Sequence, residues 1–167
     1  AAVNTWRVCS PLAVALAEDN TEATKDIIHK SPITNKLTPL MATLTHAGWP
    51  AVDALLNRAD IGEIINNLDD EGLSALAYAL KRTPTESSDV AMKIIDRGDL
   101  SVDVVNSRNL ANCNLWAIGV HSGQVAACVK LLKRQDITAE CLNACGPLGH
   151  TALNWACEKK QPDIALA

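Results

Sequence analysis

Short apolar stretches with helical spacing alternate with polar turns along the whole chain. Some stretches are built from small residues, as in residues 12–17, and others carry an aliphatic doublet with an apolar partner three or four positions earlier. Val52 stands in this relation to Leu55 and Leu56. Such spacing places apolar side chains on one face of a helix. The pattern therefore predicts pairs of short helices and an all-α fold.

Three sequence elements return in the same order. The first is a tripeptide of small–small–Leu type: Ser10-Pro11-Leu12, Thr38-Pro39-Leu40, Ser74-Ala75-Leu76, Cys113-Asn114-Leu115 and Thr151-Ala152-Leu153. The second is the doublet: Ile27-Ile28, Leu55-Leu56, Ile94-Ile95 and Leu131-Leu132. The third is an Arg-x-Asp-aliphatic segment leading to Asn: Arg58 to Asn66, Arg97 to Asn106 and Arg134 to Asn143. Self-similarity of this kind is typical of a repeat array, in which each unit buries its apolar face against its neighbours.

Capping and turn residues set the predicted bounds of the helices. Each first helix follows an expected N-cap at Ser10, Thr38, Ser74 or Thr151. The turn after it is expected at Asp19-Asn20, Ala47-Gly48, Ser122-Gly123 or the longer residues 83–88. Gly72, in Asp69-x-x-Gly72, is expected to adopt a positive φ. A further short helix is predicted within 61–65, 100–105 and 137–142.

Composition excludes several classes of protein. With 48% hydrophobic and 20% charged residues, the chain can build a core and is not a disordered segment. A net charge of −4, spread along the sequence, gives no basic patch for nucleic acid. No apolar run reaches membrane-spanning length, and no signal peptide opens the chain. Six irregularly placed cysteines indicate reduced thiols and a cytoplasmic protein.

These motifs resemble the ankyrin repeat. The matching residues are Thr38-Pro39-Leu40, Asp69-x-x-Gly72-x-Ser74-Ala75-Leu76 and Gly149-His150-Thr151-Ala152-Leu153-x-x-Ala156. The resemblance implies an all-α, ankyrin-like solenoid of stacked helix–turn–helix repeats, forming a single domain over residues 1–167. The repeats are expected at about 6–34, 35–68, 69–107, 108–145 and, truncated, 146–167, so we expect a fragment of a longer protein.

The chain also departs from the family pattern. The motif's His, which ties adjacent hairpins together in the family, is replaced by Ala13, Met41, Ala77, Trp116 and Asn154. Other contacts must therefore hold neighbouring repeats here. The third and fourth repeats are longer than is usual, and the third contains the extra residues Thr83–Ser88.

The resemblance implies a protein partner, bound by hairpin tips and by the exposed side of the first helices. The tip residues are Asn35, Leu37, Asp70, Glu71, Leu73, Asn109, Asn112, Leu148 and His150. The helix residues are Thr45, His46, Lys81, Arg82, Val120, His121, Glu158 and Lys159. Because aromatic side chains are common anchors, Tyr78 and Trp155 join this set. Trp116 is interpreted as a packing residue, and Trp155 fits packing and binding equally well.

The sequence does not favour a zinc site or a nucleophilic catalytic site. Cys141, Cys145, His150 and Cys157 are ligand types for zinc, but their spacing is looser than in paired zinc ligands. Cys113, His121 and Asp103 do not form a recognisable nucleophile motif, and no glycine-rich phosphate loop is present. We therefore expect no catalytic residue, no metal and no cofactor.

The recurring Arg-x-Asp pairs have two interpretations. They form either a charged ladder for a partner or a structural device, in which Asp caps the following short helix and Arg meets a preceding helix's carbonyl end. We favour the structural interpretation because it explains the regular recurrence.

The sequence therefore predicts a monomeric, non-catalytic protein–protein interaction module, with no nucleic-acid or membrane binding. The alternative is a substrate-presenting or regulatory domain of a larger enzyme or bacterial effector. Its catalytic part would lie outside these residues, and a secreted effector would act in the host cytoplasm.

Overall fold

The computed structural model describes residues 38–46, 49–58, 61–82, 84–146 and 149–166. These residues are mostly helical and contain no strand, only two isolated β-bridges, Leu68 with Ser74 and Arg108 with Asn114. The all-α prediction is therefore confirmed for this part of the chain. None of its helices is both long and apolar enough to cross a bilayer. The repeat predicted at 6–34, with the doublet Ile27-Ile28, lies outside the described residues.

Three kinds of helix alternate. The inner helices are α3 (Pro39–His46), α6 (Ala75–Lys81), α9 (Leu115–His121) and α12 (Ala152–Glu158). The outer helices are α4 (Trp49–Leu56), α7 (Pro84–Ile95), α10 (Val125–Leu132) and α13 (Pro162–Ala165). One-turn helices follow the first three outer helices: α5 (Gly62–Ile65), α8 (Val102–Val105) and α11 (Ala139–Leu142). The one-turn helices confirm the predictions made for 61–65, 100–105 and 137–142.

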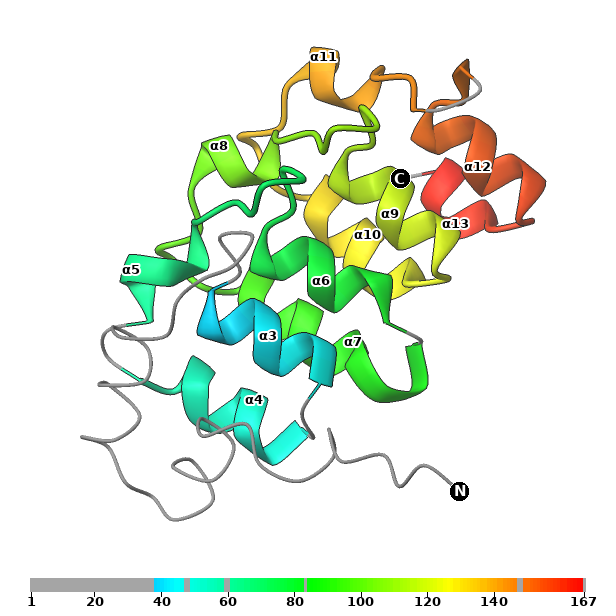
Figure 1. Ribbon diagram of the computed structural model, residues 1–167. Coiled ribbons are helices and arrows are strands. Elements are labelled where there is room, and N and C mark those ends of the chain that lie inside the picture. Colours follow the sequence, from blue (N-terminus) through cyan, green and yellow to red (C-terminus); the bar gives the residue numbers. More distant parts are fainter. Residues whose placement is uncertain (1–37, 47–48, 59–60, 83, 147–148, 167) are drawn as a thin grey trace, which may run out of the picture.

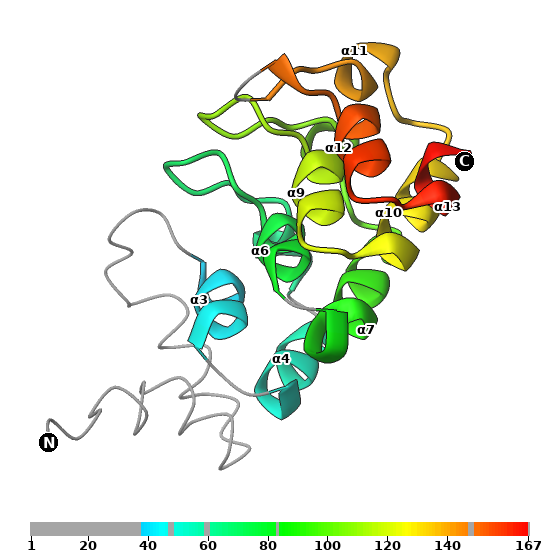
Figure 2. The same cartoon turned by 90° about the vertical axis from the view of Figure 1, so that its right-hand side faces the viewer.

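The helices form two layers in chain order. Each inner helix packs against the next inner helix, from α3 through α6 and α9 to α12, and α4, α7, α10 and α13 follow one another in the same way (Figure 1). Figure 2 shows the two layers side by side, with the hairpins that precede α6 and α9 projecting beyond the inner layer. Each described helix pair therefore packs against the described pairs that adjoin it in the sequence.

Side-chain caps fix where the inner helices begin. The hydroxyl oxygens of Thr38, Ser74 and Thr151 accept hydrogen bonds from the backbone N–H three residues later, at 3.2–3.3 Å, as predicted. In the fourth repeat the cap is Asn114, whose Oδ1 accepts from the N–H of Ala117 at 2.8 Å. The tripeptide assigned there, Cys113-Asn114-Leu115, is therefore one residue too early.

This shift changes the assignment of two residues. Trp116 now stands two residues after the cap, where Leu40 and Leu76 stand in the earlier inner helices. Only 1% of its surface is exposed, which confirms the packing interpretation. Ala117, and not Trp116, occupies the position of the motif's His.

The prediction of a turn over residues 83–88 is also wrong in part. Pro84 begins α7, which continues to Ile95 as the longest described helix. A proline at the first helical position costs no hydrogen bond, because the N–H there has no partner within the helix. The extra residues of the third repeat therefore lengthen its outer helix.

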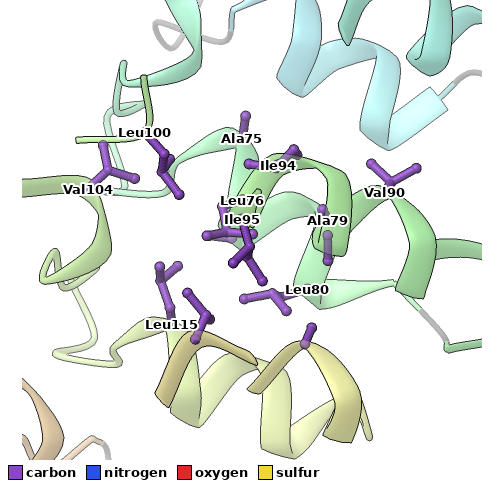
Figure 3. Close-up of a cluster of buried hydrophobic side chains, with 14 of the residues drawn as sticks. Ala75, Leu76, Ala79, Leu80, Val90, Ile94, Ile95, Leu100, Val104 and Leu115 are labelled. Carbon is purple, nitrogen blue, oxygen red and sulfur yellow. The ribbon is translucent and has the colours of Figure 1, made fainter. Parts of the chain in front are cut away.

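The aliphatic doublets lie in the core. Leu55, Leu56, Ile94, Ile95 and Leu131 are buried. In Figure 3, Ile94 and Ile95 of α7 lie among Leu76 and Leu80 of α6 and Leu115 of α9. Each such side chain contributes about 1.5–3 kcal/mol when it leaves water. One continuous core thus extends through the layers and includes residues of every described helix pair.

A tight hairpin precedes each of α6, α9 and α12. It is closed by hydrogen bonds of 3.0 Å from the N–H of Asp69 to the carbonyl of Leu73, from Asn109 to Cys113 and from Gly146 to His150. The residue before each closing position has a positive φ: Gly72 at 77°, Asn112 at 58° and Gly149 at 73°. The expectation for Gly72 is confirmed, and glycine and asparagine are the residues that tolerate this conformation best.

Asparagine side chains connect successive repeats where the motif's His is absent. The Nδ2 of Asn66 donates to the carbonyl of Asp99 at 2.7 Å, and its Oδ1 accepts from the N–H of Ser101 at 2.8 Å. The same pair of bonds joins Asn106 to Asp136 at 2.8 Å and to Thr138 at 2.9 Å. One amide thus satisfies a donor and an acceptor of the next repeat.

Two of the Arg-x-Asp pairs, Arg97 with Asp99 and Arg134 with Asp136, lie within the described residues, and each forms an ion pair inside its own repeat. The predicted contact of the arginine with a preceding helix's carbonyl end is found for Arg97, whereas the predicted caps by aspartate are not found. Arg97 makes two bonds to Asp99, at 2.8 and 2.6 Å, and donates to the carbonyl of Leu56 at the end of α4 at 2.8 Å. Arg134 pairs with Asp136 in the same way, at 2.9 and 2.5 Å.

The aspartates of these pairs do not cap the short helices. The caps of α8 and α11 are the hydroxyls of Ser101 and Thr138. A short polar side chain directly before the first helical residue reaches the helix N–H groups, whereas Asp99 and Asp136 lie two residues earlier and bind their arginines. The guanidinium of Arg97 lowers the pKa of the Asp99 carboxyl, and Arg134 does the same for Asp136.

Candidate functional site

The inner helices share a partly exposed position, so that the side chains at this position form a row. The fourth residue after each N-cap is Ala42, Tyr78, Ile118 or Trp155, and all four are partly exposed. The second and sixth positions of α3, α6 and α9 are fully buried. The large members Tyr78, Ile118 and Trp155 are named here the inner stripe. They pack against the core while part of each side chain meets solvent.

Tyr78 is held in one orientation. Its hydroxyl donates to Oδ2 of Asp69 at 2.8 Å, and Oδ1 of that carboxylate accepts the N–H groups of Glu71 and Leu73. Nζ of Lys81 lies 5.7 Å from the ring centroid, within range of a cation–π interaction. Burial, followed by the hydrogen bond to Asp69, raises the pKa of Tyr78, so its hydroxyl remains protonated. The hairpin carboxylate thereby fixes an aromatic ring on the inner stripe.

Trp155 lies between two histidines from different parts of the chain. The ring of His121, at the end of α9, meets it edge-on with centroids 5.5 Å apart. The ring of His150, in the last hairpin, is tilted against it at 5.1 Å. Nδ1 of His150 lies 3.3 Å from Oε1 of Glu158 without hydrogen-bonding geometry. Four residues of the predicted binding set are therefore in one cluster.

The seventh position after each cap borders the inner stripe. It holds Thr45, Lys81, His121 and Glu158, all exposed and all predicted as binding residues. Their side chains range from neutral through basic to acidic along the array. The hydroxyl of Thr45 donates to the carbonyl of Met41 at 2.8 Å, so that it is occupied within its own helix.

The other predicted residues fall into three groups. Asp70, Glu71, Asn112 and Lys159 are exposed. Arg82 and Asn109 are partly buried and support the fold: Arg82 donates to the carbonyl of Leu44 at 2.7 Å, and Asn109 accepts the N–H of Cys113 at 2.9 Å. Asn35, Leu37 and Leu148, and the side chain of His46, lie outside what the structure describes.

Leu73 was wrongly predicted as a tip residue. Only 1% of its surface is exposed, because its side chain turns into the core at the closing position of the hairpin. Val120 is likewise fully buried. Val120 was selected because the fourth repeat was read one residue too early. The same error hid Ile118, which the cap at Asn114 places at the position of Tyr78 and Trp155.

The zinc and nucleophile candidates do not form a site among the described residues. That part of the chain contains no group of three or more His, Cys, Asp or Glu side chains placed to hold a metal ion. Cys141 is buried, whereas Cys145 and Cys157 are exposed. Burial raises the pKa of the Cys113 thiol and raises that of Cys128 to about 12, so neither is activated as a thiolate.

Comparison with known proteins identifies no family. No protein-family model matches this chain, and no curated protein sequence matches it.

Proposed function

We propose that this chain is an ankyrin-like solenoid that acts as a non-catalytic protein–protein interaction module. It binds a partner protein along the inner stripe, on the concave face that stacked inner helices form in such a solenoid. The single observation that carries this proposal is the row of Tyr78, Ile118 and Trp155. Three successive inner helices, α6, α9 and α12, present a large, partly exposed side chain at the same position.

The chemistry of the stripe suits protein recognition. Tyrosine and tryptophan are enriched among residues that dominate binding energy, especially where they are surrounded by residues that exclude water. Tyr78 is fixed by Asp69, and Trp155 is held between His121 and His150. A side chain that is already ordered loses little conformational entropy on binding, which favours affinity.

The free cysteine thiols support a location of the protein in a reducing compartment. The cysteines of the described residues are free, and Cys145 and Cys157 are exposed. Exposed thiols persist where glutathione and thioredoxin keep them reduced. We therefore place the proposed interaction in the cytoplasm.

Affinity capture tests the proposal. The tagged chain is compared in a lysate with the variant Tyr78→Ala/Ile118→Ala/Trp155→Ala, and circular dichroism shows that both are folded. The matched control is Met92→Ala/Val125→Ala/Val129→Ala, which removes three partly exposed apolar side chains from the outer helices. We expect the inner variant to lose the captured partner and the outer variant to keep it. Retention by the inner variant, or loss from the outer one, would contradict the proposal.

A further inference from the structure

The last inner helix exposes positions that the other inner helices bury. The second and sixth residues after the N-cap are Leu40 and Leu44 in α3, Leu76 and Leu80 in α6, and Trp116 and Val120 in α9, and all are at most 1% exposed. In α12 these residues are Leu153, which is 55% exposed, and Cys157, which is also exposed.

Contacts between α6 and α9 show what covers these positions. Gly119 is the fifth residue after its cap, and a Cβ placed on it would lie 3.4 Å from Cδ2 of Leu80, the sixth residue of α6. The residue equivalent to Gly119 is Ala79 in α6 and Ala156 in α12, and both are fully buried. Between α6 and α9, the sixth position of one inner helix therefore packs on a small residue at the fifth position of the next, and α6 and α12 carry a buried alanine at that fifth position.

The side chain of Asn143 also lacks, within the described residues, the contacts that its equivalents make with a following repeat. Asn143 follows Asn66 and Asn106 at the end of the third short helix. Its Nδ2 donates to the carbonyl of Ala139 at 2.9 Å, as that of Asn106 does to Val102 at 3.0 Å. Asn66 and Asn106 also hold an Asp-x-Ser or Asp-x-Thr segment of the next repeat, whereas Asn143 is exposed and holds none in the described part of the chain.

We infer that Asn143, Leu153 and Cys157, named here the C-terminal edge, form a second binding surface, which takes a protein helix pair of the kind seen within this array. This surface is equivalent to the interfaces between described repeats. Leu153 and Cys157 stand at positions that are buried in those interfaces, and Asn143 stands at the position of the asparagines that bond across them. The occupant carries a small residue at the fifth position of its inner helix, against Cys157. Its short helix is preceded by an Asp-x-Ser or Asp-x-Thr segment, whose backbone Asn143 binds.

The occupant is specified by this combination. An extended peptide could satisfy the amide of Asn143 but would not present a helix to Leu153 and Cys157. A second copy of this chain, meeting the first edge to edge, would place Asn143 near Asn143 and supply no Asp-x-Ser/Thr backbone. This edge lies beside the inner stripe on α12, but it is formed by different residues, so the inference does not rest on the proposed function.

A chain extended in register tests the inference. Gln124 and Gln161 are equivalent N-caps of α10 and α13, so that Ala167 is equivalent to Lys130. A copy of residues 131–166 appended after Ala167 therefore continues the repeat and supplies an Asp-x-Thr segment and an inner helix with alanine at its fifth position. The cysteines of the copy are replaced by alanine, so that thiol chemistry reports only on the original chain.

Two measurements report directly on the C-terminal edge. We expect native-state alkylation of Cys157, read by peptide mass spectrometry, to be roughly tenfold slower in the extended chain, because a buried thiol reacts only after local opening. We also expect a higher urea midpoint for the extended chain. Asn143→Ala and Leu153→Asp should each remove much of that gain, while leaving the unextended chain nearly unchanged, since both side chains are exposed there.

Three results would overturn the inference. One is unchanged reactivity of Cys157 in the extended chain. Another is a gain in urea midpoint that survives both substitutions. The third is concentration-dependent dimerisation of the unextended chain in sedimentation velocity that Leu153→Asp abolishes, because the occupant would then be a second copy.

Discussion

The side chain of Asn106 binds the backbone of Thr138, its Oδ1 accepting the Thr138 N–H at 2.9 Å across the boundary between two repeats. Its Nδ2 donates to the carbonyl of Asp136 in the same segment. We expect Asn106→Ala to lower the free energy of unfolding by about 1–3 kcal/mol, because it removes these bonds and leaves two backbone groups without partners. Urea denaturation measures this difference.

Asn143→Ala is the matched control, because Asn143 stands at the same position but, among the described residues, its side chain bonds only to the carbonyl of Ala139 in the preceding short helix. We expect a loss of about 0.5 kcal/mol or less, as for most exposed surface substitutions. Equal effects of the two substitutions would show that the bonds between repeats contribute nothing beyond the local one.

Trp116 fills a position that leucine holds in α3 and α6, and its buried indole Nε1 has no hydrogen-bond partner within the described part of the chain. We expect Trp116→Ala to cost about 3–5 kcal/mol through the cavity that it leaves. Trp116→Leu should cost clearly less, because leucine refills part of that space and removes the unpaired donor. Thermal or urea unfolding of both variants tests this order, and a Leu variant no more stable than the Ala variant would contradict it.

The ion pairs Arg97–Asp99 and Arg134–Asp136 make the free energy of unfolding depend on pH in acidic solution. Hydrogen bonds from Arg97 and Arg134 lower the pKa of Asp99 and Asp136. Their contribution is therefore complete above the ordinary carboxyl pKa of about 3.9 and is lost as the pH falls through the lower folded-state values.

We expect Asp99→Asn/Asp136→Asn to lower stability at pH 6 by about 1–2 kcal/mol, a modest value because both pairs are partly exposed. The difference from the unsubstituted chain should shrink as the pH falls below the ordinary carboxyl pKa of about 3.9 and the two aspartates become protonated in the folded chain. Urea unfolding at a series of pH values measures it, and a difference independent of pH would refute this explanation.

Gly119 allows α9 and α10 to approach closely. A Cβ at this position would lie 2.5 Å from Sγ of Cys128, so Gly119→Ala should destabilise the fold although alanine favours helix by about 1 kcal/mol over glycine. Cys128→Ala removes the clashing sulfur, and we expect Gly119→Ala to be better tolerated in that background. Additive effects of the two substitutions in a double-mutant cycle would rule out the clash.

The sequence alone predicted most of the helices. Small polar caps at Thr38, Ser74 and Thr151, and the aliphatic doublets, act over a few residues and therefore leave a local pattern. The fourth repeat was misread because Leu115 was taken as the leucine of the small–small–Leu tripeptide, which placed Cys113 at its first position and the true cap Asn114 at its second. That shift of one residue concealed Ile118 and selected the buried Val120.

The contacts that join repeats were not predictable in the same way. Asn66 and Ser101 are 35 residues apart, and Asn106 and Thr138 are 32 apart, so no local spacing marks them. The sequence did show the recurrence of Asn66, Asn106 and Asn143, but the partner of each side chain depends on how the helix pairs stack. The sequence could not decide between packing and binding for Trp155 for the same reason, since His121 approaches it from another repeat.

Removal of the last helix pair tests whether each helix pair is stabilised by the pairs that adjoin it in the sequence. Deletion of residues 147–167 takes away α12 and α13, whose inner-layer and outer-layer neighbours are α9 and α10. We expect amide chemical shifts in an NMR spectrum to change in α9, α10 and the hairpin at 109–113, while those of α3 and α4 stay the same. Loss of the dispersed spectrum, or large shifts throughout α3 and α4, would show one cooperative globular core and contradict the account.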